Sequence, residues 1–378
     1  MKINFIDLAA QYQAYQQEVE DAVLAVMRSG QFIMGKAVSE FEQQMADYVG
    51  CDHVIGCSSG TDALLLSLMA LDIGPGDEVI VPAFSFIATA TCVSRLGATP
   101  VFIDVTEDIY NLDTALLAKA ITPKTKAIIP VSLYGQVADM AEINAIAGDI
   151  PVIEDAAQSF GADYQGEKSC NLSTLGCTSF FPSKPLGAYG DGGAITTNDA
   201  ALAEKLRSLR VHGQTARYYY EHLGIGGRLD TMQAAVLQVK LAHFPDEAAK
   251  RVAIGQRYSE LLANADVVTP FLKPDRNSMY AQYSVRVTDR DAFFAKLQAA
   301  DVPTAVHYPM GLHLQPCFAK YGYQTGDCPV TERVSQEIVS LPMSAFLTEA
   351  QQDYVVAAIK EPCVSFRTLI RDLNAKAE

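Results

Sequence analysis

Pro151-Val152-Ile153-Glu154-Asp155 is a short apolar run that ends in two carboxylates. A run of this length and character is typical of a strand that is buried on both faces of a parallel sheet. Three other segments have the same character, at residues 79–82, 100–104 and 127–131. Helical patterns alternate with them, at residues 61–71, 88–96, 113–121 and 140–147. This alternation predicts a βαβ architecture with a mostly parallel sheet. Ligands bind at the carboxyl ends of strands in open sheets of this kind, and Asp155 lies at such an end.

The character of the chain changes beyond this α/β region. Further elements are predicted at residues 199–206 (a helix with Asn198 as its cap), 230–262 (a long helix), 281–288 (a strand), 291–300 (a helix) and 304–307 (a strand). Pro245 marks a break or a new first turn in the long helix. We therefore expect a large α/β domain over residues 1–244 and a small α+β domain over residues 245–378.

The composition narrows the possible partners. The chain has 378 residues and a net charge of −15, which argues against binding to nucleic acid or to acidic membrane surfaces. The longest apolar stretch, residues 79–93, contains Pro82 and Ser85 and is too short to span a membrane. Residues 1–7 lack the features of a secretory signal, so we expect a cytoplasmic protein. The eight cysteines are scattered and no histidine spacing matches a metal motif, so we expect reduced thiols and no metal site.

Lys184 is the strongest candidate for a reactive group. It stands among the apolar residues of Phe180-Phe181-Pro182, and desolvation lowers the pKa of a lysine amine toward the neutral form that attacks carbonyls. A surface lysine after a turn is the simpler alternative for Lys184 alone, as a helix cap is for Asp155 alone. Together they match what pyridoxal phosphate (PLP) needs, namely an imine-forming lysine and a carboxylate for the ring nitrogen. The sequence therefore predicts a PLP site.

Other segments could complete that site. Gly60 and Thr61 open a predicted helix whose free N–H groups suit a phosphate, although any capped helix begins in this way. The hydroxyl of Ser179 could add a donor. Gln158 could reach the ring hydroxyl or simply start a helix, and Phe86 could stack on the ring or be an ordinary core residue.

Four motifs, taken in order, carry a resemblance to a known family. They are Ser59-Gly60-Thr61-Asp62-Ala63-Leu64, Glu154-Asp155-Ala156-Ala157-Gln158-Ser159, Ser179-Phe180-Phe181-Pro182-Ser183-Lys184 and Gly190-Asp191-Gly192-Gly193. The chain resembles the DegT/DnrJ/EryC1/StrS nucleotide-sugar aminotransferases over nearly its whole length. The resemblance implies an aspartate-aminotransferase-like fold (PLP fold type I) and a homodimer with shared active sites. It also implies the roles named above: Lys184 as catalytic lysine, Asp155, Gln158 and Phe86 around the ring, and Gly60, Thr61 and Ser179 around the phosphate.

Further segments resemble one branch of that family. They are residues 129–136, 169–174, 228–231 and 304–309. The branch aminates UDP-2-acetamido-2-deoxy-3-oxo-D-glucuronate with L-glutamate as donor, for lipopolysaccharide O-antigen, and by likeness Arg228, His307 and Tyr308 contact the substrate. Gly226-Gly227 replaces the usual cross-subunit asparagine before the arginine. Two alternatives stay open: an aminotransferase for a 4-keto-6-deoxy nucleotide sugar, and a non-catalytic PLP-binding sensor module.

Overall fold

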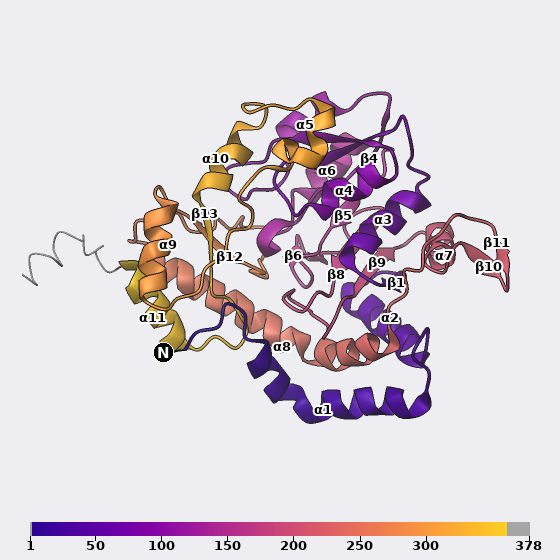
Figure 1. Ribbon diagram of the computed structural model, residues 1–378, viewed down its shortest axis with the longest axis horizontal. Helices are drawn as coiled ribbons and strands as arrows, with labels where there is room; N and C mark the ends of the chain where they lie inside the picture. Colours follow the sequence, from indigo (N-terminus) through magenta and orange to yellow (C-terminus); the bar gives the residue numbers. More distant parts are fainter. Residues whose placement is uncertain (1, 361–378) are drawn as a thin grey trace, which may run out of the picture.

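A mostly parallel sheet forms the centre of the computed structural model, which describes residues 2–360 (Figure 1). Its strands are β1 (His53–Cys57), β2 (Glu78–Pro82), β3 (Thr99–Ile103), β4 (Thr125–Ile128), β5 (Ile153–Asp155), β8 (Leu175–Ser179) and β9 (Gly193–Thr197). Hydrogen bonding orders them as β3-β2-β4 and β5-β8-β9-β1, and the parallel bridges Ile128 to Val152 and Val131 to Asp155 join the two parts. The strand β9 runs antiparallel to both of its neighbours, β8 and β1, whereas β2 pairs in parallel with β3 and β4, and β5 pairs in parallel with β8. The four predicted strands are confirmed.

Helices cover both faces of the sheet. They are α2 (Lys36–Val49), α3 (Gly60–Ala70), α4 (Ala88–Arg95), α5 (Thr114–Ala120), α6 (Met140–Ala147), α7 (Ala200–Leu209) and α8 (Thr231–Leu262). One buried cluster joins the sheet to α2, α5, α6 and α8, and a second joins it to α3, α4 and α7. The predicted helices are confirmed, but the cap before α7 is Asp199, whose side chain accepts from Ala201 N and Leu202 N. Asn198 instead accepts a hydrogen bond from Asp52 N.

The C-terminal part packs on the far end of α8. It contains β12 (Tyr283–Arg286), α9 (Arg290–Ala299), α10 (Pro329–Glu337), β13 (Ile338–Leu341) and α11 (Glu349–Lys360). The antiparallel pair β12 and β13 forms a separate buried cluster with α8, α9 and α11. The strand expected at 304–307 is wrong in extent, because only Ala305 forms a bridge there, to Ser340. The helix α8 continues through Pro245, so the expected boundary between residues 244 and 245 falls inside one helix and stays a prediction.

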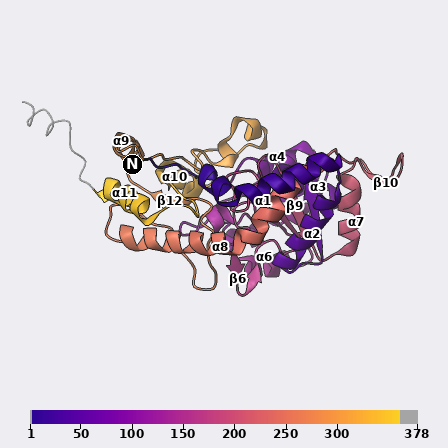
Figure 2. The ribbon, with the colours of Figure 1, turned by 90° about the horizontal axis from the view of Figure 1, so that it is seen from below.

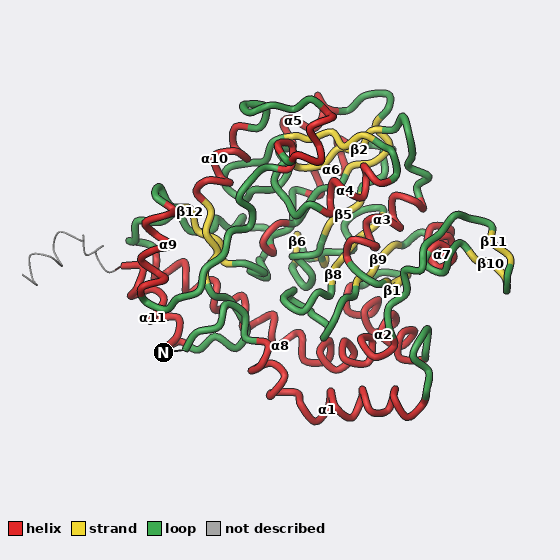
Figure 3. Tube along the Cα trace, viewed as in Figure 1, coloured by secondary structure: helices red, strands yellow, loops and turns green. Residues whose placement is uncertain are grey.

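Two further features lie at the periphery. Helix α1 (Leu8–Ser29) packs along α8, as the second view shows (Figure 2). The hairpin of β10 (Gln214–Ala216) and β11 (Tyr219–Tyr220) projects beyond α7 (Figure 3). The remaining short elements are β6 (Asp163–Tyr164), β7 (Glu167–Lys168) and the 3-10 turns Leu133–Gly135, Leu312–Leu314 and Pro316–Tyr321.

The expectations on cysteines and on membrane-spanning segments can be compared with the structure only over residues 2–360. Seven cysteines are free thiols, and six of them are buried. Cys363 lies outside the described residues. Between residues 2 and 360, no helix combines the length and apolar character needed to cross a membrane.

Candidate active site

One cleft brings together nine of the ten predicted site residues. It has a volume of about 380 Å³ and lies where the carboxyl ends of β5 and β8 meet the start of α3 and residues of the C-terminal part. The predicted residues that line it are Gly60, Thr61, Phe86, Asp155, Gln158, Ser179, Lys184, His307 and Tyr308. Arg228 does not line the cleft of its own chain.

Lys184 lies on the loop that follows β8. Its backbone N–H donates to Phe181 O at 2.8 Å, which fixes a tight turn around Pro182. Burial lowers the pKa of the Lys184 amine, and the carboxylate of Asp155 opposes part of that shift. A buried amine that is more easily neutral is suited to attack a carbonyl carbon. Because it lines the cleft with a lowered pKa, Lys184 is not the surface lysine of the simpler alternative.

Asp155 ends β5 with its carboxylate inside the cleft wall. Thr89 Oγ1 donates to its Oδ2 at 2.9 Å, and Ala157 N donates to its Oδ1 at 3.3 Å. Burial raises the pKa of this carboxyl, and the two hydrogen bonds and Lys184 only partly offset the effect. The residues that follow Asp155, 157–161, form turns and not a helix, so the helix-cap alternative is wrong. A buried carboxylate of this kind is stabilised by a cationic N–H in the cleft.

The start of α3 and the end of β8 form an anion cradle. Ser59 caps the helix by accepting from Asp62 N at 3.0 Å, and the first helical bond runs from Ala63 N to Ser59 O. The N–H groups of Gly60 and Thr61 precede that bond and point out of the helix end. A Cβ at Gly60 would lie 2.6 Å from the Cβ of Ser179, so only glycine allows this approach. The cradle therefore fits a phosphate.

The opposite wall carries aromatic and neutral polar groups. Phe86 is 49% exposed, so it is not a core residue, and its ring centroid lies 6.1 Å from that of Tyr308. Gln158 accepts from Tyr134 N at 2.7 Å and donates to Tyr308 Oη at 3.3 Å. His307 Nδ1 lies 2.8 Å from Ser340 Oγ, and burial lowers the pKa of the imidazole to about 4. His307 is therefore neutral at physiological pH.

Arg228 lies on the other side of β1, where it forms a bridge with Cys57. Its guanidinium is close to Gly226, whose position also faces the ring of His212. Within the described residues Arg228 belongs to no ion pair, whereas the nearby Arg210 pairs with Glu42.

Sequence reasoning missed several residues of the cleft. Thr89 donates a hydrogen bond to Asp155, and Gln282 lines the cavity, yet each stands in an ordinary helix or strand pattern. Asp191 also lines the cavity, and its motif gave it no role of its own. Only the fold shows that they converge.

Comparison with known proteins agrees with this geometry. The sequence profile of the DegT/DnrJ/EryC1/StrS aminotransferase family matches residues 13–360. The UDP-2-acetamido-2-deoxy-3-oxo-D-glucuronate aminotransferase of Pseudomonas aeruginosa is 50% identical, over 94% of this chain and 99% of its own length. A protein of Geobacillus stearothermophilus named pleiotropic regulatory protein is 47% identical, over 96% of this chain and 98% of its own. The PLP form of a putative sugar aminotransferase, Spr1654 from Streptococcus pneumoniae, has 26% identity and a TM-score of 0.86, covering 91% of this chain and 95% of that one.

These matches place the cleft in a known class of enzyme, the aminotransferases that adopt PLP fold type I. The chain belongs to the DegT/DnrJ/EryC1/StrS aminotransferase family.

Proposed function

We propose that this protein is the PLP-dependent aminotransferase that converts UDP-2-acetamido-2-deoxy-3-oxo-D-glucuronate to UDP-2-acetamido-3-amino-2,3-dideoxy-D-glucuronate with L-glutamate as donor, in O-antigen sugar synthesis. One observation carries the proposal: a half-buried lysine with a lowered pKa and a buried carboxylate share a cleft that ends in an anion cradle. The relative named for this substrate is half identical over nearly the whole chain, which supports the choice of sugar.

The residues of the cleft fit PLP. Asp155 would hold the ring nitrogen, the cradle of Gly60, Thr61 and Ser179 would hold the phosphate, and Phe86 would cover the ring. When bound, the cofactor withdraws electrons from the carbon that gains or loses the amino group. Gln158 would lie beside the ring hydroxyl.

Lys184 moves the proton in each half-reaction. As a general base its amine would take the proton from the α-carbon of glutamate, and in the second half-reaction it would deliver a proton to the sugar carbon that gains the amino group. The low polarity around Lys184 lowers the pKa of its amine, which favours the neutral form that a general base requires. The neutral His307 and the phenol of Tyr308 border the same space and would orient the sugar.

A homodimer would complete the site with Arg228. An exposed apolar segment, Phe32-Ile33-Met34, lies next to the start of α8, since Ile33 bridges to Asp230. Exposed apolar surface of this kind is typical of an interface. In the dimer, Arg228 would reach the substrate carboxylate in the partner's cleft, and Gly226-Gly227 would offer backbone N–H groups where relatives use asparagine.

Mixing two inactive variants tests this shared site. Lys184→Ala and Arg228→Ala chains should each be inactive, and re-formed mixed dimers should regain about a quarter of wild-type activity, because half of them hold one intact site. No regain in mixed dimers contradicts a shared site.

A panel of purified nucleotide keto-sugars with glutamate tests the substrate. We expect turnover of the UDP-3-keto-sugar acid, and turnover of 4-keto-6-deoxy sugars alone would reject it. The regulatory name of one relative is the reason to retain the sensor alternative. Cofactor binding without turnover of any keto-sugar would favour that alternative. A cytoplasmic location stays a prediction, which cell fractionation checks.

A further inference from the structure

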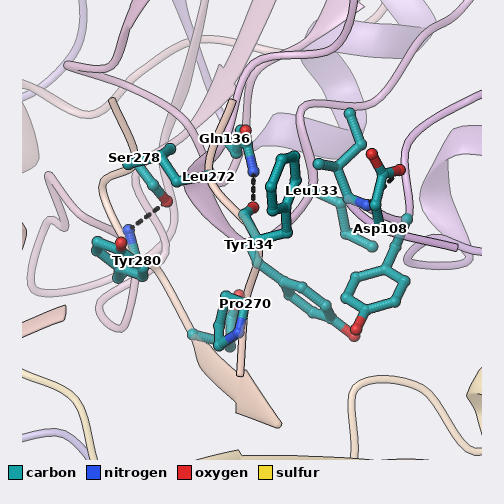
Figure 4. Close-up of a pocket in the computed structure, with 12 residues that line it drawn as sticks. Asp108, Leu133, Tyr134, Gln136, Pro270, Leu272, Ser278 and Tyr280 are labelled. Carbon is teal, nitrogen blue, oxygen red and sulfur yellow. Dashed lines mark hydrogen bonds between the residues drawn. The ribbon is translucent and has the colours of Figure 1, made fainter. Parts of the chain in front are cut away.

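Gln282 stands between two cavities of the protein. It comes directly before β12 and lines the active-site cleft together with His307 and Tyr308. It also lines a second cavity of about 20 Å³, which lies between the 3-10 turn at Leu133–Gly135 and the segment from Pro270 to Tyr280 (Figure 4). The side chain of Gln282 therefore lies in the wall that separates the active-site cleft from the small cavity.

The amide oxygen of Gln282 lacks a partner, whereas the amides of two neighbouring glutamines are paired at both ends. The residue is only 7% exposed, and its buried Oε1 accepts no hydrogen bond from residues 2–360. Gln136 lines the same small cavity, but its Oε1 accepts from Lys273 N at 2.9 Å and its Nε2 donates to Phe271 O at 2.8 Å. Gln158 in the cleft likewise uses both ends of its amide. Because leaving a buried carbonyl oxygen unpaired is costly, the free acceptor of Gln282 indicates a ligand group.

The chemistry of Gln282 and of its neighbour His307 indicates which substrate provides that ligand group. An amide oxygen needs a hydroxyl or N–H donor. The amino group of glutamate is the group that is transferred at Lys184 and the cofactor, and the two carboxylates of glutamate supply no donor. The neighbouring His307 is neutral, so this wall offers no cation to a carboxylate either. A sugar that carries ring hydroxyls and an acetamido N–H supplies the missing donor.

We propose that Gln282 accepts a hydrogen bond from a hydroxyl or N–H of the keto-sugar and thereby determines specificity in the sugar half-reaction. This inference rests on the proposed function. A site built to pair with a substrate donor rejects substrates that lack the donor far more strongly than an apolar pocket can. Gln282 would therefore act on the sugar and not on the amino donor.

Single-turnover kinetics of the two half-reactions test the proposal. Absorbance of the cofactor is followed after wild-type or Gln282→Leu holoenzyme is mixed with glutamate, and after the amino form is mixed with the UDP-keto-sugar. We expect kcat/KM for the sugar to fall by roughly 10- to 100-fold, while the rate with glutamate stays within about twofold. The melting temperature should not fall, because an unpaired buried amide is replaced by an apolar group of similar size.

Gln136→Leu is the matched control, since it removes a fully paired amide from the same small cavity. It should lower the melting temperature. Should Gln282→Leu not fold, Gln282→Met, which keeps the unbranched shape, takes its place. An equal loss in both half-reactions, or no loss in either, overturns the proposal for Gln282. Failure of the wild-type enzyme to aminate any keto-sugar overturns the proposed function itself.

Discussion

Replacement of Asp155 by asparagine should maintain or raise the stability of the protein without cofactor, but it should weaken the binding of PLP. Burial raises the pKa of Asp155, so the ionised carboxylate is disfavoured in the folded empty cleft. A carboxyl with a raised folded pKa costs stability as the pH rises from its unfolded pKa through the folded one, and that cost persists at neutral pH. Asparagine keeps the shape and removes the charge. The empty variant should therefore melt at the same or a higher temperature than the wild type at neutral pH.

The cofactor should bind the same variant more weakly. A hydrogen bond to a charged group contributes about 1.5–3 kcal/mol, so loss of the bond between Asp155 and the ring nitrogen should weaken binding by roughly 10- to 150-fold. Turnover should fall as well, because the ring nitrogen is no longer held protonated. Absorbance titration gives the Kd for PLP, and thermal unfolding of the empty protein gives the stability.

Asp104→Asn is the control for this pair of measurements. Asp104 is as buried as Asp155, at 6% exposure for each, but it accepts from Val330 N, Thr331 N and Thr331 Oγ1 at 2.7–2.8 Å, away from the cleft. Its replacement should lower stability and leave the Kd for PLP unchanged. The reasoning is refuted if Asp155→Asn binds PLP like the wild type, or if it destabilises the empty protein as much as Asp104→Asn does.

Three further predictions follow from the same cleft. Lys184→Ala should abolish turnover and the visible absorbance of the lysine-linked cofactor, and an active Lys184→Ala enzyme would contradict its role. Gly60→Ala should force Ser179 away and weaken PLP binding by about 1–3 kcal/mol, whereas Gly74→Ala, with open space at its Cβ, should not; calorimetric titration compares the two. Because the pKa of His307 is about 4, its imidazole is already neutral at pH 6 and above. Replacing it with a side chain that does not ionise should therefore leave the shape of the pH–rate profile unchanged in that range. A His307→Asn enzyme should thus have a lower rate but the wild-type pH dependence between about pH 6 and 8, and a lost titration step there would refute this.

The sequence predicted the sheet and most of the cleft because both depend on local patterns. The sequence segments 79–82, 100–104, 127–131 and 151–155 are mostly apolar, and the acid at the end of β5 and the lysine in an apolar loop can be recognised without a structure. Such patterns do not report on pairing between distant segments. Asn198 does not cap α7 because its side chain accepts a hydrogen bond from the distant Asp52 N. The segment around Ala305 forms a single bridge where its sequence predicted a strand.

The position of Arg228 and the free amide of Gln282 lay beyond sequence reasoning for the same reason. Arg228 was grouped with His307 and Tyr308 by likeness alone, and the fold separates it from them by placing it across β1. Gln282 sits in an alternating segment in which any polar residue would be taken as solvent-exposed. Only the convergence of Leu133–Gly135 and the segment before β12 buries it.

Lys184 and Asp155 together explain why the cleft favours the cofactor. Burial drives both Lys184 and Asp155 toward their neutral forms, and their mutual attraction offsets only part of that cost. PLP would relieve both at once, because its cationic ring N–H would stabilise the carboxylate and its aldehyde would suit an amine with a lowered pKa. In the folded protein burial thus disfavours the charged form of both side chains, and the affinity for PLP should depend on both of them. Replacing either residue alone should therefore lose more affinity than its own contact provides, and the double variant should lose less than the sum of the two single losses.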